Sequence, residues 1–95
     1  MTNKQKIFLK NLAKDIKPLI IGKDGFNERQ YNDLKDYLTK HEVMKIKLLE
    51  TSPTDIEEVI SKLEEDNINI INKIGRTLII YQENPKLKNK LELPN

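Results

Sequence analysis

The chain has 95 residues, of which 37% are hydrophobic and 34% are charged, and its formal net charge is +2. This length and composition predict a single domain with one modest hydrophobic core, and the absence of cysteine excludes disulfides and thiolate chemistry. No apolar run reaches the roughly 18 residues that a membrane-spanning helix needs. We therefore expect a cytoplasmic protein that has no membrane partner.

Charge is distributed unevenly along the chain. Residues 1–23 carry six lysines and one aspartate, whereas residues 50–66 carry seven acidic residues and one lysine. This asymmetry predicts one basic face and one acidic face on the folded domain. A compositional bias is an alternative explanation for the excess of lysine, because the chain has 15 lysines and only two arginines.

The first predicted element is a helix over residues 4–16. Apolar residues recur there at helical spacing and form a stripe of Phe8, Leu9, Leu12, Ala13 and Ile16. A second stripe beside the first consists of Lys6, Lys10, Lys14 and Lys17. Like charges at this spacing repel one another, so the lysine stripe suits a phosphate backbone better than a merely solvated face. Pro18 ends the helix.

The stretch Gly22-Lys23-Asp24-Gly25 lies between an apolar strand and the start of a second helix. The strand, residues 19–21, is entirely apolar, which is typical of the centre of a sheet or of a strand covered on both faces. The two glycines allow a close approach of the backbone to a ligand, and the helix start offers free N–H groups and a positive dipole end. This arrangement predicts a phosphate site, of the kind with which KH domains clamp a nucleic-acid backbone.

The second helix is expected to run from Asn27 to about Lys40. Asn27 is a favourable N-cap, and Gln30 occupies the capping-box position. Phe26 and Tyr31 have the spacing of a hydrophobic staple. The start of this helix is therefore well defined by its sequence.

A strand over residues 43–49 and a third helix come next. Apolar and basic residues alternate in the strand, which gives it an apolar face of Met44, Ile46 and Leu48 and a basic face of Lys45 and Lys47. Ser52-Pro53 predicts the N-cap and first position of the third helix, which we expect to end near Asn67. Acidic residues cover the outer face of this helix: Glu57, Glu58, Glu64, Glu65 and Asp66.

Residues 68–74 and 77–82 are two strand-like runs separated by Gly75-Arg76, which predicts a hairpin. The element order is thus α-β-α-β-α-β-β. Right-handed crossovers put the second and third helices on one face of the sheet. We predict an α/β fold, a two-layer sandwich whose other sheet face is open and carries Lys45 and Lys47. We expect one domain over residues 1–83 and a C-terminal tail over residues 84–95.

The chain offers no constellation of residues for catalysis. It has one histidine, His41, and no cysteine, whereas a metal site needs several converging ligands. Neither the P-loop motif nor the dinucleotide-binding glycine motif is present. We therefore expect no enzyme activity, no metal and no cofactor.

Several stretches, taken together, resemble the sequence pattern of a known protein family. They are Lys4-Gln5-Lys6 with Leu9 and Leu12-Ala13, Lys17-Pro18 with Ile21 to Gly25, His41 to Lys47, Ile74 to Tyr81, and the ending Leu91-Glu92-Leu93-Pro94. In this order and spacing the chain resembles the YhbY-like, or CRM-domain, family of RNA-binding proteins. The resemblance covers nearly the whole chain.

The resemblance implies a fold similar to the C-terminal domain of translation initiation factor three, with a mixed four-stranded sheet in the order 1-2-4-3. It also implies an RNA-binding factor of ribosome assembly, whose partner is ribosomal RNA precursor within the large subunit. We expect a monomer that recognises RNA backbone and shape, because few aromatic residues are available for base stacking. The expected RNA-binding residues are Lys6, Lys10, Lys14, Lys17, Gly22, Lys23, Gly25, Lys45, Lys47, Arg76 and Thr77.

Two other functions are compatible with the sequence. An Alba-like protein that binds DNA or RNA has a similar layout of strands and helices. A protein-interaction module that uses the acidic third helix belongs to a different class, and in that case the lysine excess would be compositional. Salt-dependent RNA binding distinguishes the nucleic-acid functions from the last one.

Overall fold

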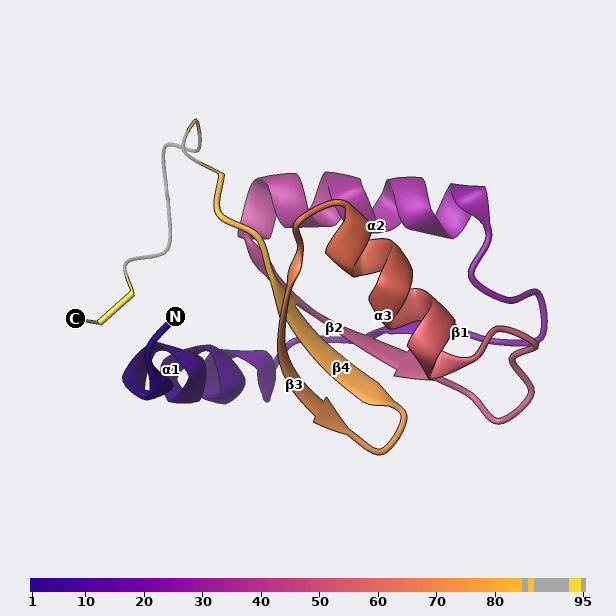
Figure 1. Ribbon diagram of the computed structural model, residues 1–95, viewed down its shortest axis with the longest axis horizontal. Coiled ribbons are helices and arrows are strands. Elements are labelled where there is room, and N and C mark those ends of the chain that lie inside the picture. Colours follow the sequence, from indigo (N-terminus) through magenta and orange to yellow (C-terminus); the bar gives the residue numbers. More distant parts are fainter. Residues whose placement is uncertain (85, 87–92, 95) are drawn as a thin grey trace.

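The computed structural model describes residues 1–84, 86, 93 and 94 (Figure 1). Within these residues, three helices and four strands follow one another in the predicted order: α1 (Asn3–Ala13), β1 (Leu19–Ile21), α2 (Glu28–His41), β2 (Val43–Leu48), α3 (Ile56–Glu65), β3 (Asn69–Ile74) and β4 (Thr77–Tyr81). Most of the expected tail, residues 84–95, lies outside the described residues. Within the described part of the chain, no helix is long and apolar enough to cross a membrane.

The four strands form one mixed sheet in the order β1-β2-β4-β3, as the resemblance implied. β1 is parallel to β2, whereas β4 is antiparallel to both of its neighbours. β1 therefore lies at an edge, and the expectation of a central or doubly covered strand is wrong. Ile21 is fully buried against the helices, but Ile20 on the other face of β1 remains 48% exposed.

α2 and α3 pack on one face of the sheet and form the predicted two-layer sandwich with it (Figure 1). Their apolar residues meet the alternate residues of β2 and β4 in the main core. Its fully buried members include Ile21, Leu34, Ile46, Val59, Leu63, Leu78 and Ile80.

The second face of the sheet is not open, because α1 packs on it (Figure 1). The strands present apolar residues on this face too, among them Val43, Ile79 and Tyr81. Leu9 and Ala13 of α1 are fully buried against them and form a second, smaller core. The apolar stripe of the first helix was recognised in the sequence, but the surface that it covers was not.

Two helix ends differ from the prediction. α1 ends at Ala13 rather than at residue 16, and the Ile16 N–H donates to the Ala13 carbonyl, so that Ile16 turns back onto the second core. The N-cap of α3 is Asp55 rather than Ser52. The Ser52 hydroxyl instead accepts the Thr54 N–H at 3.2 Å in a local turn, which delays the helix by three residues.

Candidate nucleic-acid interface

The Gly22–Gly25 loop is a tight turn in which the Gly25 N–H donates to the Gly22 carbonyl at 2.9 Å. Gly25 is buried and has a φ of +72°, a conformation that favours glycine. A Cβ on Gly25 would lie 2.8 Å from the Thr54 hydroxyl oxygen, which also accepts the Phe26 N–H at 3.0 Å. Gly25 is therefore required where the loop packs against the segment before α3.

Gly22 has different surroundings. It is half-buried, and a Cβ there would make an ordinary contact of 3.7 Å with the Leu49 side chain. Between the two glycines, Lys23 and Asp24 are both exposed. Asp24 does not cap α2, since that role belongs to Asn27, so the loop presents one positive and one negative side chain to solvent.

The start of α2 has the predicted cap and staple. The Asn27 side chain accepts the Gln30 N–H at 2.9 Å, and the Phe26 and Tyr31 rings meet edge to face with centroids 5.5 Å apart. Gln30 does not complete a capping box, because its side-chain amide donates to the Ile20 carbonyl of β1 at 3.1 Å. This bond fastens the helix start to the edge strand, and the Gln30 N–H is already used by the Asn27 cap.

Arg76 lies at the same end of the sheet as the glycine loop. Its guanidinium donates to the Leu49 carbonyl at 3.0 Å, and the Leu49 N–H donates to the Ile21 carbonyl at 2.9 Å. Arg76 is exposed apart from this bond. The hairpin turn and the glycine loop are thus linked through the residue that follows β2.

On the face covered by α1, the strand register places the predicted residues in two rows. One row consists of Lys45, Ile79 and Asn72, and the next consists of Ile20, Lys47, Thr77 and Ile74. α1 lies against the first row and borders a hollow of about 190 Å³, which we call the α1 hollow. It is lined by Lys10, Ala13, Lys14, Lys45, Asn72, Ile74, Thr77 and Ile79.

The structure does not bring all of the predicted RNA-binding residues to one place. Lys10, Lys14, Lys45 and Thr77 surround the α1 hollow, and Lys47 occupies the next row of the sheet. Lys6 is exposed one helical turn before Lys10. Lys14 is the C-cap residue of α1 and Lys17 lies beyond it, so the assignment of Lys17 to the lysine stripe of the helix was wrong.

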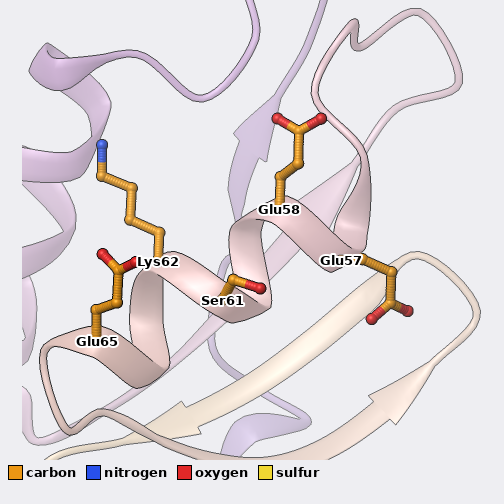
Figure 2. Close-up of a pocket in the computed structure, with 5 residues that line it drawn as sticks. All are labelled: Glu57, Glu58, Ser61, Lys62 and Glu65. Atoms are coloured by element: carbon orange, nitrogen blue, oxygen red, sulfur yellow. The ribbon is translucent and has the colours of Figure 1, made fainter.

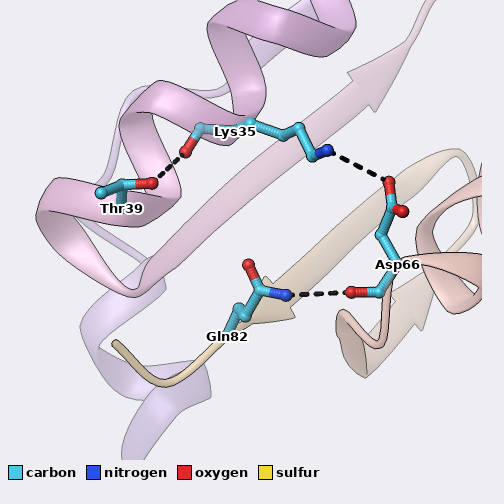
Figure 3. Close-up of polar contacts among 4 residues, drawn as sticks. All are labelled: Lys35, Thr39, Asp66 and Gln82. Atoms are coloured by element: carbon cyan, nitrogen blue, oxygen red, sulfur yellow. Dashed lines mark hydrogen bonds and ion pairs between the residues drawn. The ribbon is translucent and has the colours of Figure 1, made fainter. Parts of the chain in front are cut away.

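The acidic residues of α3 lie on the opposite side of the sheet. Figure 2 shows a shallow depression along this helix, lined by Glu57, Glu58, Ser61, Lys62 and Glu65. On this side Lys73 pairs with Glu57 at 2.9 Å, and Lys35 of α2 pairs with Asp66 at 3.5 Å (Figure 3). The sheet therefore separates the acidic helix from the lysines of α1 and β2.

Glu42 is a structurally important residue that the sequence did not indicate. It is fully buried at the end of α2, in the left-handed conformation with a φ of 66°. Its carboxylate accepts the Asn84 N–H at 2.8 Å, and its carbonyl accepts the Gln82 N–H at 2.9 Å. The only signal in the sequence is a charged residue directly before an apolar strand, which is too common to identify a buried carboxylate.

The charge of Glu42 acts on the Tyr81 phenol. Burial of its ring raises the pKa of the Tyr81 phenol above the usual value, and the negative charges of Glu42 and Glu83 raise it further. The fold therefore favours the neutral form of the Tyr81 phenol.

Among the described residues, no group of three or more histidine, aspartate or glutamate side chains is arranged to hold a metal ion. The fold and the exposed lysines define a small α/β domain with one basic face, a class that suits a polyanionic ligand. Comparison with known proteins narrows this class. Residues 1–82 match the CRS1/YhbY (CRM) domain, and the chain belongs to this family.

Individual relatives agree with the family assignment. The chain is 28% identical to a probable RNA-binding protein of Pseudomonas aeruginosa, over 90% of this chain and 85% of that protein. It is also 28% identical to an RNA-binding protein of Haemophilus influenzae, over 99% and 95% of the two chains. The solution structure of a hypothetical protein from Staphylococcus aureus, described as a candidate RNA-binding protein, has a TM-score of 0.72 and 34% identity and covers 99% of each chain. These matches favour the CRM assignment over the Alba-like alternative.

Proposed function

We propose that this protein binds ribosomal RNA precursor within the large subunit and acts in the cytoplasm as a ribosome-assembly factor. Membership of the CRM family supports RNA as the ligand. The observation that carries the proposal is the grouping of Lys10, Lys14, Lys45 and Lys47 on one face of the sheet, with the acidic α3 on the other. A surface divided in this way orients the protein on a phosphate backbone as it approaches.

The proposed contact has two parts. The lysines of α1 and β2 neutralise phosphates, while Lys23 and the first turn of α2 receive a further phosphate at the glycine loop. Arg76 is linked to that loop through Leu49 and adds charge at the same end of the sheet. Such contacts recognise backbone and shape and carry little sequence information by themselves.

Sedimentation of cell extract on a sucrose gradient tests the ribosomal part of the proposal. We expect the tagged protein to travel with precursors of the large subunit and to leave them as salt is raised. A variant with Lys10→Ala and Lys14→Ala should shift toward the top of the gradient, whereas Lys35→Ala with Lys62→Ala on the opposite side should not. Migration of the wild type with small-subunit particles, or with none, would contradict the assembly role.

A further inference from the structure

The α1 hollow is unusual because it is apolar inside and basic around its edge. Ala13 and Ile79 are almost fully buried there, whereas Lys10 and Lys45 are half-exposed and Lys14 is exposed. Charge repulsion among the three lysines is relieved when anions bind between them. The apolar interior serves no purpose for a phosphate, so the hollow suits a ligand that has both a phosphate and an uncharged flat part.

The volume of the hollow bears on the size of the flat part of the ligand. An apolar cavity of about 150 Å³ is large enough to hold a benzene ring. The α1 hollow has a volume of about 190 Å³, so it has room for one six-membered ring. The hollow can therefore receive the ring of a nucleobase.

Two polar residues, Asn72 and Thr77, are among those that line the hollow. Asn72 is paired with Ile79 in the sheet, and Thr77 begins the same strand β4. Both are half-buried and line the hollow. An amide offers donors and an acceptor, and a hydroxyl can act as either, so these two side chains can hydrogen-bond the edge of a base.

We infer that the α1 hollow receives one unstacked base of single-stranded RNA, whose neighbouring phosphates are paired with Lys10, Lys14 and Lys45. This inference rests on the proposed RNA binding and adds a base-binding site to it. The exposed Ile74, at 64%, and Ile20, at 48%, lie in the next row of the same sheet face and offer apolar surface to an adjacent base. The protein thus reads unpaired RNA, in addition to the backbone.

The test compares two short probes with the same number of phosphates. One is an oligouridylate, and the other is an oligomer of the same length that lacks every base. Affinities of the full-length protein are measured by fluorescence anisotropy at low salt. We expect the baseless oligomer to bind more weakly by about fivefold or more, because the loss of one stacked base has at least this effect.

A variant that fills the hollow identifies where the base is bound. Thr77→Phe adds an aromatic ring inside the hollow without changing the charge, and it should remove most of the difference between the two probes. Ser61→Phe adds the same ring on α3 and should leave the difference unchanged. Thermal unfolding of both variants checks their stability. Methyl NMR of the wild type gives an independent measurement, since a bound base should shift the methyl signals of Ile79 and Ile74 and the baseless oligomer should not.

The possible failures can be told apart. Equal affinity of the wild type for both probes would overturn the base site and leave phosphate binding intact. A base-dependent affinity that survives in a folded Thr77→Phe variant, without methyl shifts at Ile79, would also overturn it, because the base would then bind elsewhere. Failure to bind any RNA probe would overturn the proposed function itself.

Discussion

Gly22, Gly25 and Gly75 differ in what surrounds their missing side chains. Gly25 has a positive φ and no room for a Cβ, Gly75 has a positive φ of +57° and open space around it, and Gly22 has an ordinary contact distance and no such φ. The Gly-x-x-Gly pattern in the sequence indicated two glycines with one role. The structure shows that their roles differ, because contacts with Pro53 and Thr54 cannot be seen from local sequence.

We expect alanine at each glycine to separate these roles. Gly25→Ala should lower the free energy of unfolding most, by more than the roughly 1–2 kcal/mol of a left-handed alanine, since Thr54 must also move. Gly75→Ala should cost about 1 kcal/mol, and Gly22→Ala less. Chemical denaturation measures all three. Equal losses at Gly25 and Gly75 would show that the contact with Thr54 is unimportant.

Because Gly22→Ala is expected to fold normally, it is the better probe of close backbone approach to RNA. A loss of RNA affinity in this variant, at unchanged stability, would support the loop as a phosphate site. Gly25 variants change the packing of the loop and cannot give this information.

Tyr81 should make stability depend on pH at the alkaline end. Its phenol has a raised pKa in the folded protein, whereas in the unfolded chain it titrates near the usual value of about 10. The contribution of this group is fully present below that value and is lost as the pH rises through the folded pKa. The wild type should therefore lose stability relative to Tyr81→Phe as the pH is raised past about 10. Parallel unfolding profiles of the two proteins would contradict this.

At the scale of elements, the hairpin and the order of helices and strands were predictable because each segment has a clear periodicity. The position of α1 on the sheet was not predictable in this way. Its stripe showed that it covers something, but both faces of β4 are apolar, and only the three-dimensional arrangement decides which helix covers which face. The edge position of β1 was hidden for a similar reason, since three apolar residues give no alternation to interpret.

The lysines of α1 provide a prediction at this scale. Replacing Lys10 and Lys14 by alanine should weaken RNA binding and reduce the slope of log affinity against log salt by about 1.4 units, because two phosphate contacts on a single strand are lost. Lys35→Ala with Lys62→Ala removes the same charge on the α2 and α3 side, where both ammonium groups lie about 5 Å from the Tyr31 ring. Fluorescence anisotropy over a range of salt concentrations measures both slopes. Equal changes in the two double variants would show that binding depends on net charge alone.

For the molecule as a whole, the sheet acts as a divider between opposite charges. The uneven charge along the chain correctly indicated an acidic helix on one side, since α3 carries Glu57, Glu58 and Glu65. It did not indicate that Lys35 and Lys73 would lie on that same side and pair with acidic residues there. Long-range pairing of this kind depends on register and cannot be obtained from composition.

The acidic side should be dispensable for RNA binding. Glu58→Lys with Glu65→Lys leaves the pair between Lys73 and Glu57 intact while reversing the charge along α3. We expect affinity for single-stranded RNA to be nearly unchanged, with some gain in non-specific binding from the added charge. A large loss of affinity in the folded variant would place α3 within the interface.

The hydrogen bond between Glu42 and Asn84 bears on where the domain can be cut. The family match ends at residue 82, so a shorter version made by following that match would lack the N–H of residue 84. It would also lack the Asn84 amide, which donates to the Thr39 carbonyl at 2.8 Å at the end of α2. A buried carboxylate deprived of one of its donors is costly, by about 1–3 kcal/mol. Fragments intended for crystallisation or NMR should therefore extend past Asn84, because the boundary of the sequence match is not the boundary of the folding unit.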